Sequence, residues 1–216
     1  MSLPDPRMNG RRHGGSRGPG KWTLLAVVFA VLISFDQATK FLAVDRLTTV
    51  FQVRGDTTLG EKVKGFYGHR HLLPYATAPH VVWKPWWAMK YVENEGAAWG
   101  LFQDLSERVR TVFFTVISLA AVGFILGYYR KLEPTQRYGQ VALALLLAGA
   151  VGNFVDRLAR GYVIDFIDWS ARGWHWPTFN VADSCIVLGV AMLLLQPGTR
   201  KAKAAERELE GAAREG

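Results

Sequence analysis

Residues 138–157 read YGQVALALLLAGAVGNFVDR, a run of apolar and small residues that ends in three polar side chains, Asn153, Asp156 and Arg157. A helix of about 20 residues spans the apolar core of a bilayer, so this stretch has the length of a transmembrane segment. Three further apolar runs occupy residues 22–44, 109–129 and 179–196. The apolar residues are gathered into these runs and do not recur at the period of an amphipathic helix or strand. We therefore expect an all-α membrane protein with a four-helix transmembrane bundle.

Positive charge is gathered in three segments: the N-terminal tail, the short connection between the second and third runs, and the stretch after residue 197. Lys and Arg are enriched in cytoplasmic loops, so we expect these segments, and with them both termini, on the cytoplasmic side. The net charge of +8 is then explained by membrane topology, and we expect no nucleic-acid partner. The segments 45–108 and 158–178 lie on the outer side.

The expected organisation has three parts. They are a disordered cytoplasmic tail over residues 1–20, a four-helix transmembrane domain over residues 21–197 and a cytoplasmic C-terminal tail over residues 198–216. The outer insertion, about residues 45–108, contains short β-type runs at 80–83 and 89–92 that are separated by a segment with Pro85. We expect a small outer β-cradle here, held at the headgroup zone by tryptophans.

Charged and amide side chains inside these helices need an explanation, because an ionisable group in a spanning segment costs roughly 2.5–3.5 kcal/mol. At about 1.5 Å of rise per residue, all of them fall in the outer part of the membrane. Asn153 and Asp156 share one helical face, and so do Asn180 and Asp183, since each pair is separated by three residues. The charged and amide residues inside the expected helices are Asp36 and Lys40 in the first run, Asn153, Asp156 and Arg157 in the third, and Asn180 and Asp183 in the fourth.

Two facing carboxylates that share a proton activate a water molecule and polarise a peptide carbonyl. We expect Asp156 and Asp183 to form this pair, with the proton on Asp156, because the C-terminal end of a helix disfavours a second negative charge. The chain has no HExxH pair, and we expect no metal and no other cofactor. A Ser34–Lys40 dyad is the alternative, but six residues separate these side chains onto different helical faces. Cys185, the single cysteine, is expected to be a packing residue.

Five short motifs follow one another along the chain: DQATK at 36–40, NEGAAWG at 94–100, GAVGNFVDR at 149–157, VIDF at 163–166 and FNVADS at 179–184. Together they resemble the motifs of the bacterial lipoprotein signal peptidases, signal peptidase II. The resemblance implies an aspartyl endopeptidase of the bacterial inner membrane that removes the signal peptide from prolipoproteins, cutting before a cysteine that carries diacylglycerol. It implies the dyad Asp156 and Asp183, an active site toward the periplasm, and inhibition by globomycin.

Further residues match motif positions that the resemblance assigns to shaping the site or contacting substrate: Asp36, Lys40, Asn94, Gly96, Asn153, Arg157, Asp165 and Asn180. Structural alternatives stay open for several of them. Asp36 and Lys40, four residues apart, also suit an intrahelical ion pair, and Arg157 also suits the headgroup zone. We expect Trp99 and Phe102 to form a lid over the substrate. The expected partners are the lipid-modified prolipoprotein and membrane lipids, and we expect a monomer.

Some features depart from the resemblance: Trp99 stands where Phe is usual, the outer segment between Leu47 and Lys90 is long, and the N-terminal tail is extended. Two other functions are compatible with the residues alone. One is a proton-coupled transporter or channel, in which intramembrane charges form a relay. The other is a catalytically inactive lipoprotein-binding protein. The transporter is disfavoured because the acids gather toward one face of the membrane and the helices show no internal repeat.

Overall fold

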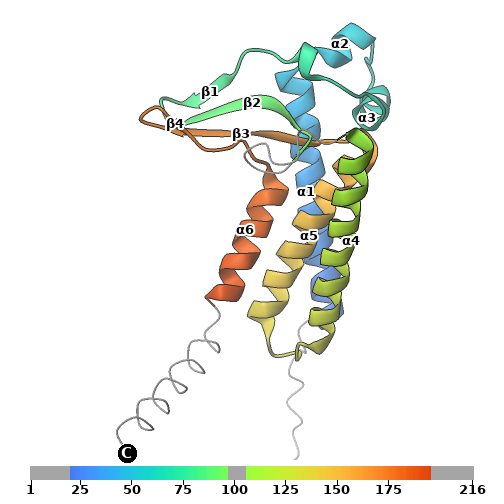
Figure 1. The fold of residues 1–216 in the computed structure, drawn as a ribbon, viewed down its shortest axis with the longest axis vertical. Coiled ribbons are helices and arrows are strands. Elements are labelled where there is room, and N and C mark those ends of the chain that lie inside the picture. Colours follow the sequence, from blue (N-terminus) through green and yellow to red (C-terminus); the bar gives the residue numbers. More distant parts are fainter. Residues whose placement is uncertain (1–19, 97–105, 196–216) are drawn as a thin grey trace, which may run out of the picture.

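The computed structural model of the chain describes residues 20–96 and 106–195 (Figure 1). Three long helices are apolar enough to cross a membrane: α1 (Lys21–Leu47), α4 (Glu107–Lys131) and α5 (Arg137–Arg160). A shorter apolar helix, α6 (Val181–Leu194), lies beside α5. All of the helices expected from the sequence are present, and their bounds differ from the expected ones by a few residues.

The surfaces of these helices fit a lipid environment. Large apolar side chains point outward along α1, α4 and α6, among them Val31, Phe35, Val116, Phe124 and Val187, which are each more than half exposed. Exposed apolar surface on this scale is unfavourable in water and favourable in a bilayer. The described part of the chain is thus a multi-pass membrane protein.

A four-stranded antiparallel sheet lies across one end of the helices, in the order β1-β2-β3-β4 (Figure 1). Its strands are β1 (His80–Trp83), β2 (Trp87–Asn94), β3 (Val163–Ala171) and β4 (Trp174–His175). The register pairs His80 with Met89 and Asn94 with Val163. The sheet therefore joins the first outer segment to the second, so that the motifs at 94–100 and 163–166 begin on neighbouring strands.

The expectation of a β-rich outer insertion is only partly right. Strand β1 has the expected bounds and β2 is longer than expected, but the insertion also contains α2 (Val50–Arg54), α3 (Leu59–Gly68) and the 3₁₀ turn η1 (Leu73–Tyr75). Helix α3 begins with a capping box, in which Thr58 and Glu61 each accept a hydrogen bond from the other's backbone amide. This signal was readable in the sequence as a threonine followed three residues later by a glutamate.

Helices α5 and α6 pack closely because small residues line their contact. A Cβ atom added to Gly149 would lie 2.4 Å from the carbonyl oxygen of Ala182, and one added to Gly189 would lie 2.8 Å from the carbonyl oxygen of Ala142. Small residues at such contacts let two helix backbones approach each other within a membrane. This approach brings the C-terminal turns of α5 next to the first turn of α6.

Candidate functional site

A closed cluster of four charged side chains lies where α1 meets α5. The ammonium group of Lys40 lies 2.9 Å from both Asp36 Oδ2 and Asp156 Oδ2. Arg160 Nη2 lies 2.5 Å from Asp156 Oδ1, and its Nη1 donates to the carbonyl oxygen of Phe66. All four residues are at most 1% exposed. With two carboxylates and two cations, the cluster is neutral, which is how buried charge is tolerated.

The backbone completes this cluster. Asp36 Oδ1 accepts the amide of Ala182 in the first turn of α6, and Asp156 Oδ2 accepts the amide of Ile164 in β3. Gln37 donates to both carboxylates. Both oxygens of Asp156 are therefore occupied by donors, and the residue ties α1, α5 and β3 together.

A second group of carboxylates, Asp165 on β3 and Asp183 in the first turn of α6, is held by amides. Asp165 accepts hydrogen bonds from Asn94 Nδ2 at 2.9 Å and Asn180 Nδ2 at 2.7 Å. Asp183 accepts from Asn153 Nδ2 at 2.7 Å and from the backbone amide of Asn180 at 3.2 Å. Asn180 and Asp183 form the capping box of α6. Its geometry aims Asp183 back toward Asn180, the residue that also binds Asp165.

The two acids of this group differ in their surroundings. Asp165 is 1% exposed, whereas Asp183 is partly exposed. Burial and the neighbouring charge of Asp183 raise the pKa of Asp165 to about 7, and the hydrogen bonds from Asn94 and Asn180 oppose this rise. A carboxyl group that titrates near neutrality beside a second carboxylate is the pattern of an acid–base pair.

Both acids line a cavity of about 1650 Å³ beneath the sheet. Its apolar wall combines Phe114 and Ile117 of α4 with Val187 of α6. Arg157 also lines it, with its guanidinium 4.3 Å from the ring centre of Phe114. Six tryptophans extend the cavity along the sheet: Trp83, Trp86, Trp87, Trp169, Trp174 and Trp176.

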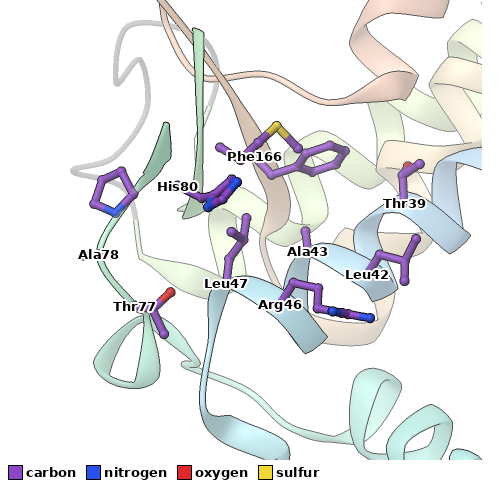
Figure 2. A pocket seen from close by; sticks show the side chains of 11 residues that line it. Thr39, Leu42, Ala43, Arg46, Leu47, Thr77, Ala78, His80 and Phe166 are labelled. Atoms are coloured by element: carbon purple, nitrogen blue, oxygen red, sulfur yellow. The ribbon is translucent and has the colours of Figure 1, made fainter. Parts of the chain in front are cut away.

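A second cavity, of about 600 Å³, lies between the C-terminal part of α1 and the sheet (Figure 2). It is lined by Leu42, Ala43 and Leu47 on α1 and by Met89 and Phe166 on the strands. Phe166 lines this cavity, and Asp165, the residue before it on β3, lines the first cavity. Neighbouring side chains of a strand point to opposite faces of the sheet, so the two cavities lie on opposite sides of β3. No carboxylate lines this second cavity among the described residues, so the cavity with Asp165 and Asp183 is the candidate active site.

The sequence profile described as signal peptidase (SPase) II matches residues 28–197, and that range includes every residue of both carboxylate groups. The chain belongs to the signal peptidase II family. Members of this family are aspartic proteases, in agreement with a carboxylate pair at the cavity.

Relatives in this family cover most of the chain. A protein named lipoprotein signal peptidase from Anaeromyxobacter sp. (strain Fw109-5) is 62% identical over 185 residues, which are 84% of this chain and 88% of that protein. One of the same name from Geobacter metallireducens is 36% identical over 81% of this chain and 90% of its own length. A solved structure of a bacterial membrane enzyme is similar with a TM-score of 0.61 at 26% identity, covering 84% of this chain and 91% of that one.

The structure brings most of the expected site residues together, but in two groups. Asn94, Gly96, Asn153, Arg157, Asp165 and Asn180 surround the cavity or its acids, together with Asp183. Asp36 and Lys40 belong to the closed cluster, as the alternative of an intrahelical ion pair predicted. The lid residues Trp99 and Phe102 lie outside the described residues.

The expected pairing of Asp156 with Asp183 does not match this geometry. Asp156 is fully buried between Lys40 and Arg160, with both of its oxygens facing cations, and it does not line the cavity. Asp165 takes the expected place beside Asp183. Arg160 was missed as the partner of Asp156, although its position four residues further along the same helix was the available signal.

Proposed function

We propose that this signal peptidase II family member removes the signal peptide from diacylglyceryl-modified prolipoproteins, cutting before the lipidated cysteine, with Asp165 and Asp183 as its catalytic pair. The observation that carries the proposal is that these two carboxylates meet at a large apolar cavity between a membrane helix bundle and an outer sheet. An apolar cavity of this size suits a substrate that carries both an apolar helix and acyl chains.

The proposed chemistry needs only these two acids and a water molecule. Asp183, ionised at the start of α6, takes a proton from water as the water oxygen attacks the scissile carbonyl carbon. Asp165, protonated, donates its proton to the carbonyl oxygen, which gives a tetrahedral diol. As the carbon–nitrogen bond breaks, Asp183 passes its proton to the leaving nitrogen and Asp165 recovers one from a diol hydroxyl. The products are the free amine of the lipidated cysteine and the carboxyl end of the signal peptide.

Asn94, Asn153 and Asn180 orient the acids in this proposal, because each donates to a carboxylate. Arg157 contacts substrate. Its Nε is buried and has no hydrogen-bond partner within the described ranges, although its Nη2 binds the carbonyl oxygen of Gly96 at 3.2 Å. A carbonyl oxygen of bound lipopeptide would satisfy this donor.

We propose the following topology. Helix α6 is the fourth membrane span, both termini are cytoplasmic, and the sheet with the active site faces the periplasm in the inner membrane. Helices α1, α4 and α5 are long enough to span, and α6 continues the apolar layer beside α5. The division into tails over residues 1–20 and 198–216 and a domain over 21–197 belongs to this proposal, as do a monomeric state, lipid contacts and binding of globomycin.

The experiment is incubation of the purified full-length chain with a diacylglyceryl prolipoprotein and with its unlipidated form, followed by a gel shift. We expect cleavage of the lipidated precursor alone, both with and without EDTA. Cleavage of neither precursor, or equal cleavage of both, would contradict the proposed substrate. A transporter is disfavoured, because the buried carboxylates of residues 20–96 and 106–195 all lie on β3 or are hydrogen-bonded to β3 or to the first turn of α6.

A further inference from the structure

Three consecutive residues at the end of β2 are each held by a side chain from a different element. Asn94 Nδ2 donates to Asp165 of β3. The Glu95 carboxylate lies 2.5 Å from Arg110 Nη2 of α4, and the carbonyl oxygen of Gly96 accepts from Arg157 of α5. The turn that carries Asn94 is thus attached to the sheet and to two membrane helices at once.

The Glu95–Arg110 contact is unusual for an ion pair near a surface. The Arg110 side chain is only 10% exposed, although it stands in the first turn of α4, while Glu95 is 40% exposed. A buried guanidinium makes strong charge-assisted hydrogen bonds and requires a partner of opposite charge. Glu95 is such a partner, and it is the residue directly between Asn94 and Gly96.

The turn also selects the orientation of the Asn94 amide. The backbone amide of Gly96 donates to Asn94 Oδ1 at 3.2 Å, which leaves Nδ2 directed at Asp165. This arrangement requires the backbone on both sides of Glu95 to stay in place. Arg157 holds the Gly96 side of the turn, and Arg110 holds Glu95 itself.

We propose that Arg110 and Glu95 are positioning residues, which hold the turn at residues 94–96 so that Asn94 donates to Asp165 in the catalytic pair. The inference rests on the proposed function, since it assigns these residues to the geometry of that pair. Neither residue touches the reacting atoms. They act through Asn94.

The proposal has a signature in the pH dependence of cleavage. Asp165 faces Asn94 from β2, Asp183 and Asn180 from the start of α6, Lys40 from α1 and Arg157 from α5. The hydrogen bond from Asn94 lowers the pKa of Asp165, so its loss raises that pKa further. Because Asp165 acts in its protonated form, activity in the variants then persists to higher pH, by about 0.5–1 unit for one hydrogen bond.

The test compares Glu95→Gln, Arg110→Gln and the swapped pair Glu95→Arg with Arg110→Glu in the full-length chain. A fluorogenic diacylglyceryl lipopeptide serves as substrate, and kcat is measured from pH 5 to pH 9. Each single variant should lose about tenfold in kcat, since small errors in placing a catalytic group are costly. In each, the alkaline limb of the pH profile of kcat should also move to higher pH. The swapped pair should recover part of both losses.

The matched control is Glu107→Gln. Glu107 stands one turn before Arg110 and pairs with Arg70 at 3.6 Å, but both side chains are at least half exposed, and such surface pairs contribute little. This variant should keep the wild-type profile. Wild-type chain without any cleavage would contradict the proposed function itself. If the wild type cleaves but the pH profile of kcat in Glu95→Gln is unshifted, the positioning role alone is overturned, whether or not kcat falls. Melting temperatures in detergent identify any variant that has lost its fold.

Discussion

Two groups of aspartates lie near the end of the helix bundle that meets the sheet, and they differ in what holds them. Asp36 and Asp156 are bound to Lys40 and Arg160, with every oxygen occupied, away from the cavity. Asp165 and Asp183 are bound by asparagine amides at the cavity wall. Cations hold a carboxylate in its ionised form, whereas amides hold it without neutralising it. Under the proposed function, the kind of partner, and not the presence of an aspartate, separates a structural group from a reactive one.

The largest expected effect comes from removing either acid of the open pair. Asp165→Asn and Asp183→Asn should each reduce cleavage by about 1000-fold or more, because the first variant loses the general acid and the second loses the general base. Melting temperatures should stay close to that of the unchanged chain. The control is Asp168→Asn on the same strand, where the carboxylate pairs with Lys90 at 2.7 Å, and this variant should still cleave. Normal turnover by Asp165→Asn would refute the proposed pair.

Removing the charge of Asp156 should instead break the closed group. Asp156→Asn leaves Lys40 and Arg160 with a deficit of negative charge in a fully buried site, and loss of one partner from a buried ion pair costs about 3–5 kcal/mol. Thermal unfolding in detergent should show a marked decrease in stability, larger than for Asp183→Asn. Equal stability of these two variants would contradict the difference between the groups.

A smaller effect is expected from crowding the closed group. In Gly152→Ala the new Cβ would lie 2.6 Å from Asp36 Oδ2 and 3.1 Å from Ala182 Cβ, so α5 and α6 have to separate. The stability loss should be about 1–3 kcal/mol, as for other overpacked sites. Gly127→Ala on α4 is the control, because nothing within 4 Å would meet its Cβ. Both variants would be compared by thermal unfolding, and equal midpoints would exclude a close contact at Gly152.

The smallest effect is a displacement on the pH axis. With the pKa of Asp165 raised to about 7, the protonated acid is lost as pH rises through that value, so kcat should fall on the alkaline side of neutrality. Asn94→Ala removes an opposing hydrogen bond and should move this limb to higher pH. A limb that stays in place in Asn94→Ala would show that another group controls it.

Much of the architecture was predictable because it is encoded locally. The apolar runs, the strand at His80–Trp83 and the acids at the ends of α5 and α6 follow from length, composition and spacing. Helices α2 and α3 were missed although the capping box of α3 was readable, since both are short and α3 carries three glycines, which are poor helix formers. Arg160 was missed because it lies beyond the expected helix end at residue 157, outside every motif that was considered.

The sequence by itself determined that this chain is a membrane protein of the signal peptidase II family with several aspartates at one membrane level, since burial of apolar runs and motif order are properties of the chain alone. Only the tertiary structure decided which aspartates meet. Asp156 and Asp183 each follow an asparagine by three residues, so they look alike in sequence. The packing of α1 against α5 gives Asp156 two cations, however, and the pairing of β2 with β3 brings Asp165 to the cavity. The environment of a carboxylate is set by residues distant in sequence, because electrostatic interactions act through space.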